Sequence, residues 1–138
     1  MIRRAFVLAL ETLHGTRIVA APEALDALDA ATWSTSVTVL RFAPDDVFVL
    51  GAETISISGE YAIVEAESGF DGCWLTDEQL AHVAEHIDWP LPVKRPVLVQ
   101  GFVAGVPAKI WLTSSATGER SLLLCAAPYA CELTERLA

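Results

Sequence analysis

The residues best suited to chemistry are two histidines in the sequence His82-Val83-Ala84-Glu85-His86. This sequence matches H-x-x-E-H, the zinc motif of the inverted zinc peptidases, in which two imidazoles bind one metal and the glutamate serves as base. At about 100° per residue, however, both rings fall opposite the apolar stripe of their predicted helix, on a solvated polar face. A third ligand would have to come from Glu132 or Glu135 on a short terminal helix. We therefore predict no metal site.

The cysteines Cys73, Cys125 and Cys131 are an odd number at spacings that match no zinc or disulfide framework. One of them could act as a nucleophile beside a histidine, although nothing in the spacing requires it. Cys125 lies in an apolar strand and Cys131 in a helix of small residues, which favours inert core thiols. We expect reduced thiols in a cytoplasmic protein.

The remaining polar residues form no catalytic group. Asp45-Asp46 is typical of a turn, and Glu65 and Glu67 are typical of the exposed positions of a strand. No glycine-rich sequence of the phosphate-binding types opens a helix. We therefore predict no catalytic residue and no activity for this chain alone.

Composition limits the partners. The 138 residues carry a net charge of −9, which argues against a nucleic acid or an anionic membrane surface. The longest candidate span, Pro96 to Ala108, is too short to cross a bilayer, and the apolar N-terminal run is too short for a signal peptide. A hydrophobic share of 53% nevertheless exceeds what one small core needs. A protein interface is therefore the remaining way to cover the surplus apolar surface.

The centre of the chain predicts strand, turn, short strand and helix in succession. Glu53–Ser58 and Tyr61–Glu67 are expected to pair as a hairpin about Gly59-Glu60. A turn at Ser68–Gly72 and a short strand at Cys73–Leu75 follow. A capping box formed by Thr76 and Gln79 then begins a helix that extends to Ile87, anchored by Leu80, Val83 and Ile87.

The flanking segments complete an α+β domain over residues 1–138. Arg4–Leu10 is compatible with a strand or a helix, and proline at the first position starts a helix at Pro22–Asp29. The C-terminal helix should turn Tyr129, Ala130, Leu133 and Leu137 inward. Further strands are expected at Ser34–Phe42, Val47–Leu50, Pro96–Val103, Val106–Thr113 and Arg120–Ala126. We predict a single domain, an antiparallel sheet with helices packed on one face.

The tryptophans indicate where an interface could lie. Trp89 stands between a helix end and two prolines, where the chain should cross the surface. Trp74 and Trp111 suit either the core or an interface. Both faces of the hairpin at Val97–Leu112 are apolar, so one face needs a cover. The candidate interface residues are Trp89, Leu98, Phe102 and Trp111.

Five segments in order resemble a known family. Pro44–Leu50 resembles its G-P-D-E-W-L-L-L segment, and Val64–Phe70 its V-D-V-S-D-x-R strand and turn. Ile87–Leu91 resembles C-P-L-D-L, Gln100–Leu112 the hairpin Q-T-x-L-A-x-x-x-V-L-L-W-R, and Ala127–Leu133 the helix start R-S-F-A-x-Y-L. Over residues 44 to 137 the chain thus resembles the γ subunit of heterotetrameric sarcosine oxidases, a relative of the folate-binding aminomethyltransferase (glycine cleavage T-protein) superfamily. Leu112 and Ala127 replace arginines of that family, so no contact made through those arginines is carried over.

The resemblance implies a noncatalytic accessory subunit. Such a chain binds no cofactor alone and docks on larger flavoprotein subunits, which oxidise N-methyl amino acids and pass the one-carbon unit to tetrahydrofolate. A second hypothesis is a self-associating module that binds a folate-like or other small ligand. The third, an autonomous enzyme built on His82 and His86, has the least support.

Overall fold

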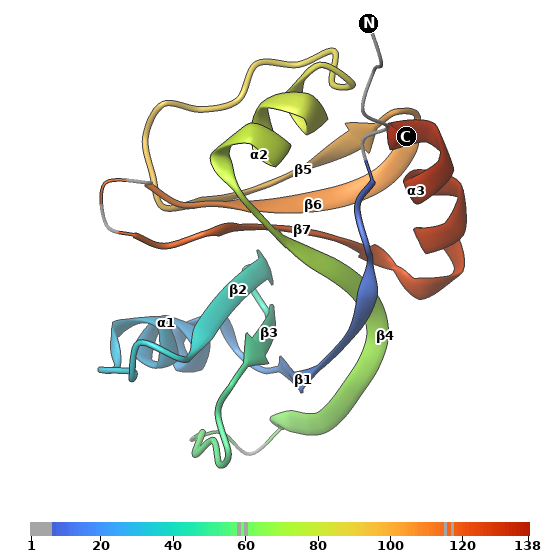
Figure 1. The fold of residues 1–138 in the computed structure, drawn as a ribbon. Coiled ribbons are helices and arrows are strands. Elements are labelled where there is room, and N and C mark those ends of the chain that lie inside the picture. Colours follow the sequence, from blue (N-terminus) through green and yellow to red (C-terminus); the bar gives the residue numbers. More distant parts are fainter. Residues whose placement is uncertain (1–6, 58, 60, 115, 117) are drawn as a thin grey trace, which may run out of the picture. The chain divides into compact units, whose positions relative to one another are not determined.

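A computed structural model of the protein describes residues 7–57, 59, 61–114, 116 and 118–138 (Figure 1). The chain divides into two compact units, which we describe separately. The small unit is Leu13–Ser68, and the large unit combines Met1–Thr12 with Gly69–Ala138.

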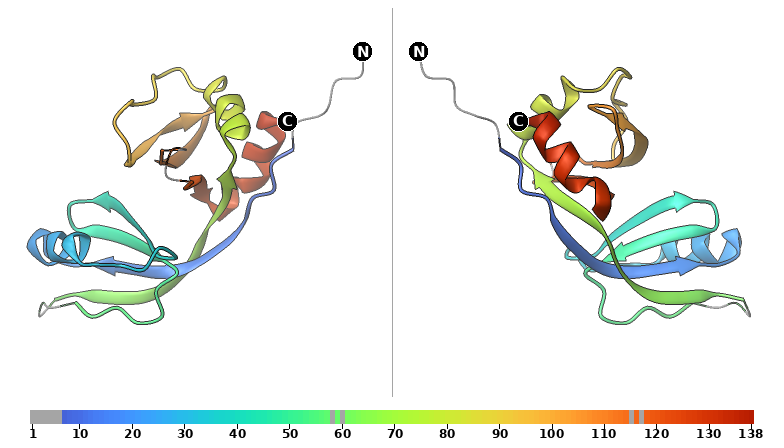
Figure 2. Two further views of the ribbon diagram at one scale, coloured as in Figure 1. Left: turned by 60° about the vertical axis from the view of Figure 1, so that its left-hand side comes forward. Right: turned by 90° about the vertical axis from the view of Figure 1, so that its right-hand side faces the viewer.

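The strands of the described residues form one antiparallel sheet of order β2-β3-β1-β4-β7-β6-β5. β1 and β4 are neighbouring strands of this sheet (Figure 2). The strands are β1 (Glu11–Val19), β2 (Thr38–Ala43), β3 (Asp46–Leu50), β4 (Ile63–Leu75), β5 (Val97–Val103), β6 (Val106–Leu112) and β7 (Ser121–Ala126). The helices are α1 (Pro22–Ala30), α2 (Asp77–Ala84) and α3 (Ala130–Leu137), with a short 3-10 helix, η2 (Ala127–Tyr129), before α3. The predicted antiparallel sheet and the mixed α and β content are confirmed.

β4 is one continuous strand, so the predicted turn at Ser68–Gly72 is wrong. Phe70 to Leu75 pair antiparallel with Ala126 to Ser121 of β7. The ladder with β7 pairs the backbone from Phe70 onward, and it outweighs the preference of Gly72 for turns.

The predicted hairpin at Glu53–Ser58 is also corrected. Residues 53–57 form no strand, while Ile55 and Ile57 pack as partly buried side chains against the core of the small unit. Ile55 and Ile57 alternate with polar residues because they pack against the core, and the segment makes no hydrogen bonds of a β-sheet. The predicted turn lies partly outside the described residues, which omit Ser58 and Glu60.

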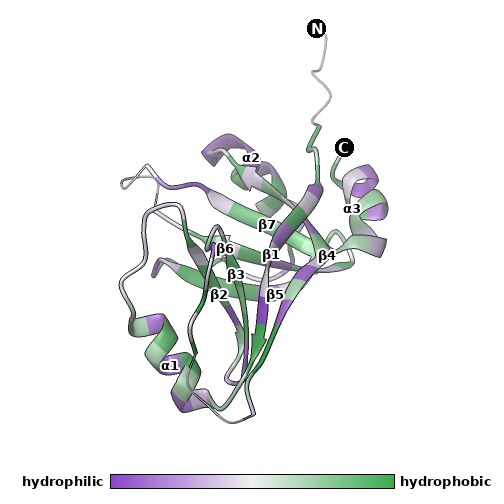
Figure 3. Ribbon diagram, turned by 90° about the horizontal axis from the view of Figure 1, so that it is seen from below, coloured by the Kyte–Doolittle hydropathy of each residue, from purple (hydrophilic) through white to green (hydrophobic). Residues whose placement is uncertain are grey.

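The core of the large unit is one cluster of buried side chains from β6, β7, α2 and α3. Along β6, buried residues alternate with more exposed ones, and the buried set is Val106, Ala108, Ile110 and Leu112. Leu80 and Val83 of α2 and Leu133 and Leu137 of α3 belong to the same cluster. Both helices therefore contribute to the same buried cluster as β6, and α3 shows hydrophilic and hydrophobic sides in Figure 3.

The predicted capping box at the start of α2 is confirmed. The Gln79 N–H donates to Thr76 Oγ1 at 3.1 Å, and the Thr76 N–H donates to Gln79 Oε1 at 2.9 Å. The helix ends at Ala84 and not at Ile87, although Ile87 still packs against the core from the turn that follows.

In the small unit, α1 packs Leu25 and Leu28 against Ile18 of β1 and against Val47 and Val49 of β3. Thr32 lies beyond the helix end and is exposed.

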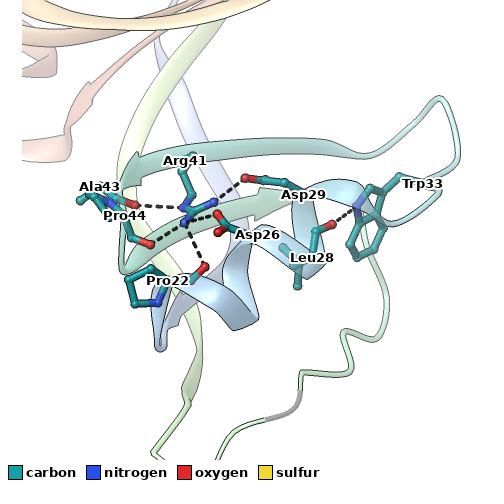
Figure 4. Close-up of polar contacts among 8 residues, drawn as sticks. All are labelled: Pro22, Asp26, Leu28, Asp29, Trp33, Arg41, Ala43 and Pro44. Carbon is teal, nitrogen blue, oxygen red and sulfur yellow. Dashed lines mark hydrogen bonds and ion pairs between the residues drawn. The ribbon is translucent and has the colours of Figure 1, made fainter.

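Arg41 of β2 ties α1 to the turn between β2 and β3 (Figure 4). Its guanidinium donates to Asp29 Oδ2 at 2.6 Å and to Asp26 Oδ1 at 3.1 Å, both on α1. It also donates to the carbonyls of Pro44 at 2.5 Å and Ala43 at 3.1 Å. The Arg41 side chain thus binds two carboxylates of α1 and two carbonyl groups at the turn after β2.

The core position of Leu80 gives a first prediction. Leu80→Ala should lower the free energy of unfolding by about 2–5 kcal/mol, because truncation leaves a cavity under α2. Urea unfolding followed by circular dichroism measures it. The exposed variant Glu78→Gln serves as control and should stay within about 0.5 kcal/mol of the wild type. An equally small change for Leu80→Ala would contradict this placement of α2.

Arg41 gives a second prediction. Arg41→Lys should cost about 1–3 kcal/mol, because lysine cannot supply the planar fork that reaches both acids and both carbonyls. Most of the loss should persist in about 1 M salt, which screens exposed ion pairs but not hydrogen bonds to carbonyls. Unfolding in low and high salt tests this, with the exposed Arg120→Lys as control. A loss that disappears in salt would show that only the ion pairs matter.

Candidate functional site

The large unit carries a hollow of about 260 Å³, which we call the Phe102 hollow. It is lined by residues of β4, β5, β6, β7 and η2. The residues that define it are Phe70, Gln100, Phe102, Pro107, Lys109 and Tyr129, and the thiol-bearing Cys125 lies in its wall.

The β5–β6 hairpin positions most of these side chains. The turn uses Ala104 and Gly105 at positive φ of 50° and 79°, and the register pairs Phe102 with Pro107 and Gln100 with Lys109. Directly paired residues of a sheet project to the same side. These four side chains therefore lie on the face opposite to the buried Val106, Ala108 and Ile110.

Aromatic rings border the hollow without being buried. Phe102 is 64% exposed and Tyr129 is 43% exposed, while Phe70 is half-buried. Tyr129 was expected to point inward, and the structure corrects this. Tyr129 is the last residue of the 3-10 helix η2. Because a 3-10 helix has fewer residues per turn than an α-helix, the α-helical spacing of α3 does not predict the direction of the Tyr129 side chain. Ala130, Leu133 and Leu137 are buried as predicted.

The polar component of the hollow is an amide and an ammonium side by side. Lys109 Nζ donates to Gln100 Oε1 at 2.6 Å, across the two paired strands. This bond fixes the positive charge next to an apolar wall, where it can meet an acid of a bound molecule.

Cys125 shows why the hollow is not a nucleophilic site. The thiol is 2% exposed, and burial, followed by the charge of Asp71, raises its pKa to about 11. At neutral pH it is therefore protonated, and the thiolate is the form that attacks.

The other cysteines differ in environment. Cys73 is half-buried, and burial raises the pKa of its thiol. Cys131, expected in the core, is exposed on α3, so the expectation of three buried thiols is wrong for it. Residue size and polarity alone did not reveal which side of α3 it occupies.

The four predicted interface residues separate into two groups. Leu98 and Trp111 are paired across β5 and β6, on the same face as Phe102, and both are half-buried. Trp89 instead lies over Gly101, where an added Cβ would be 2.8 Å from the indole nitrogen, and its N–H donates to the Phe102 carbonyl at 3.1 Å. It packs against the core cluster from this position, so the expected exposed ring at Trp89 is corrected. Trp74 is 40% exposed.

The two histidines are engaged with backbone carbonyls. His82 Nε2 lies 2.7 Å from the Leu137 carbonyl and His86 Nδ1 lies 3.1 Å from the His82 carbonyl. A carbonyl oxygen only accepts, so these nitrogens carry the protons. Both side chains are half-buried, which corrects the expectation of a solvated face. Within the described residues, no group of three or more histidine, cysteine or acidic side chains is arranged to hold a metal.

Two acids expected to be simply exposed have a structural partner. Arg17 donates from Nε to Asp46 Oδ1 at 2.5 Å and from Nη1 to Glu67 Oε1 at 3.0 Å. The three side chains belong to β1, β3 and β4 of the small unit. These carboxylates therefore stabilise the small unit through their ion pairs with Arg17.

Phe70, Lys109 and Tyr129 were not predicted as site residues. The one signal available was Lys109, a lone charge within an otherwise apolar hairpin. Phe70 was missed because a turn was predicted at its position, and Tyr129 because the predicted helix placed it facing the core.

Comparison with protein-family models, with curated proteins and with solved structures gives no match. Among the helices of the described residues, none has the length and apolarity needed to cross a membrane.

The thiols give a third prediction. With iodoacetamide at about pH 8, near the ordinary thiol pKa, Cys131 should be alkylated first and Cys125 last. Labelling of Cys125 should rise with pH up to about 11, because its raised pKa delays formation of the thiolate. Peptide mass spectrometry measures each rate, with Cys131→Ser to confirm the assignment of the fast site. If Cys125 reacts as fast as Cys131 in the folded protein, it is neither buried nor perturbed as described.

Proposed function

We propose that the protein is a noncatalytic accessory subunit that docks on a larger protein through the Phe102 hollow. The observation that carries the proposal is Phe102 itself, 64% exposed at the border of a hollow that also contains Phe70 and Tyr129. Aromatic residues gathered at a concave apolar site are typical of the energetic centre of a protein interface.

The size of the hollow favours a partner's side chains over a free ligand. Its volume of about 260 Å³ is smaller than the range of about 300–1,000 Å³ that is usual for small-molecule sites. One or two apolar side chains of a partner fit such a volume. Covering Phe102 in this way would contribute about 1.5–3 kcal/mol.

The chemistry of the described residues supports binding in place of catalysis. The hollow offers an amide, an ammonium and a phenol, while the Cys125 thiol in its wall is buried in the core cluster and protonated at neutral pH. No base lies among its side chains to activate that thiol or the phenol.

The partner we propose is a flavoprotein of the sarcosine-oxidase type. The resemblance over residues 44 to 137 supports this choice, since such a complex oxidises N-methyl amino acids on its larger subunits. In this proposal flavin and tetrahydrofolate belong to the partner subunits. In this proposal the exposed side of the β5–β6 hairpin that carries Phe102 faces the partner. The complex would be cytoplasmic, in keeping with three free cysteines.

A second candidate is a small-ligand module that uses the same hollow. Lys109 favours it, because an ammonium held by Gln100 at 2.6 Å beside aromatic rings suits an anionic ligand with a flat apolar body. In this alternative, the hollow binds a folate-like molecule or a second copy of this chain.

Co-purification gives the test, and our fourth prediction. Tagged wild-type protein expressed in its source should retain a larger protein with flavin absorbance. Phe102→Ser should reduce retention by at least about tenfold, since a central aromatic contact is worth about 2 kcal/mol or more. Val93→Ser is the matched control, because Val93 is 96% exposed and does not line the hollow.

The outcomes separate the parts of the proposal. Equal retention by wild type and Phe102→Ser would exclude the hollow as the docking site. A retained partner without flavin would exclude the oxidase-like complex. A chain that stays monomeric at micromolar concentration in gel filtration and retains nothing would exclude the accessory subunit altogether.

A further inference from the structure

The small unit contains a second hollow, of about 350 Å³, which we call the Trp33 hollow. It is formed by the loop between α1 and β2 and by the loop that follows β3. Its polar and aromatic side chains are Trp33, Ser34, Ser36, Glu53 and Thr54. Neither the proposed docking function nor the sequence motifs involve it.

The backbone fixes the two loops against each other. The pairing of Thr38 with Leu50 brings the start of β2 next to the end of β3. Immediately beyond, Gly51 adopts a φ of 84°, and a Cβ added there would lie 2.3 Å from the Ser36 carbonyl oxygen. Only glycine allows this approach, so the distance between the loops is set by main chain.

Hydrogen bonds within the first loop order its side of the hollow. The Val37 N–H donates to the Ser34 carbonyl at 3.0 Å, and the hydroxyls of Ser34 and Ser36 are 2.9 Å apart. These bonds close a turn that presents two hydroxyl groups beside the indole of Trp33.

Trp33 offers an aromatic surface in a fixed orientation. Its indole N–H donates to the Leu28 carbonyl at 3.0 Å, near the end of α1 (Figure 4). The ring also packs against the core of the small unit and remains half-buried. Because the one polar atom of the indole is already bonded, the ring meets a ligand through its π surface.

Glu53 is the one charged side chain among the residues that line the hollow. It is exposed, and within the described part of the chain it takes part in no ion pair. A tryptophan face attracts cations, a carboxylate neutralises them, and a net charge of −9 raises their local concentration.

We propose that the Trp33 hollow binds a small organic cation with an alkylated ammonium group. The alkyl groups would contact the indole, the charge would be balanced by Glu53, and the hydroxyls of Ser34 and Ser36 would bind a polar group elsewhere on the ligand. A metal ion fits less well, because hard cations require several oxygen ligands and the hollow supplies a single carboxylate.

The test uses choline and its neutral isostere 3,3-dimethylbutan-1-ol, which differ in charge but hardly in shape. Titration of the wild-type protein, followed by NMR of the indole N–H signals, should show saturable choline binding in the millimolar range or tighter. Trp33→Phe assigns the responding signal. The neutral isostere should bind at least about fivefold more weakly, since the cation–π and carboxylate interactions are absent.

Glu53→Gln isolates the charge without disturbing packing, because Glu53 is exposed. It should weaken choline binding at least about fivefold, while Glu65→Gln, an exposed acid of β4 outside the hollow, should leave it unchanged. Equal binding of the two probes, full binding by Glu53→Gln, or no saturable shift of the Trp33 signal would each overturn the proposal. None of these results bears on the Phe102 hollow.

Discussion

The large unit depends on the burial of β7 on both of its faces. Ser121 to Cys125 are all buried, and the strand pairs with β4 on one side and with β6 on the other. A strand without a solvated face must be apolar at consecutive positions, and Leu122, Leu123 and Leu124 satisfy this requirement. Its backbone groups must also be paired along both edges, since water does not reach them. That second requirement keeps Phe70 to Leu75, Gly72 included, in β4.

The same constraint determines where binding can occur. On one face of β6 and β7 the side chains are small or aliphatic, and they belong to one closely packed cluster with residues of α2 and α3. The side chains that project to the other face include Lys109, Gln100 and Phe102. A polar pair and an exposed ring are therefore placed by strand alternation, with no loop needed to carry them.

Several charged side chains of the described residues serve the fold. Arg17 and Arg41 each bind two acids of the small unit, and Arg136 bonds both to Glu132 and to the Ala104 carbonyl at the β5–β6 turn. The histidines are likewise bonded to carbonyls at helix ends. The two hollows described among the residues of the structure each combine aromatic surface with a charged side chain, lysine in the large unit and glutamate in the small unit.

The sequence by itself determined the elements whose signals are local. The capping box at Thr76 and Gln79, the proline that starts α1 and the alternation of β6 are each contained in a few neighbouring residues, and the structure has all three. Only the tertiary structure decided the course of residues 53–75 and the composition of the Phe102 hollow. Ser68–Gly72 has the local composition of a turn, and its strand conformation is imposed by a partner about fifty residues away in sequence. Phe70 and Tyr129 become neighbours of Phe102 through strand register and a 3-10 turn, which are set by hydrogen bonds between distant segments and leave no periodic pattern in the chain.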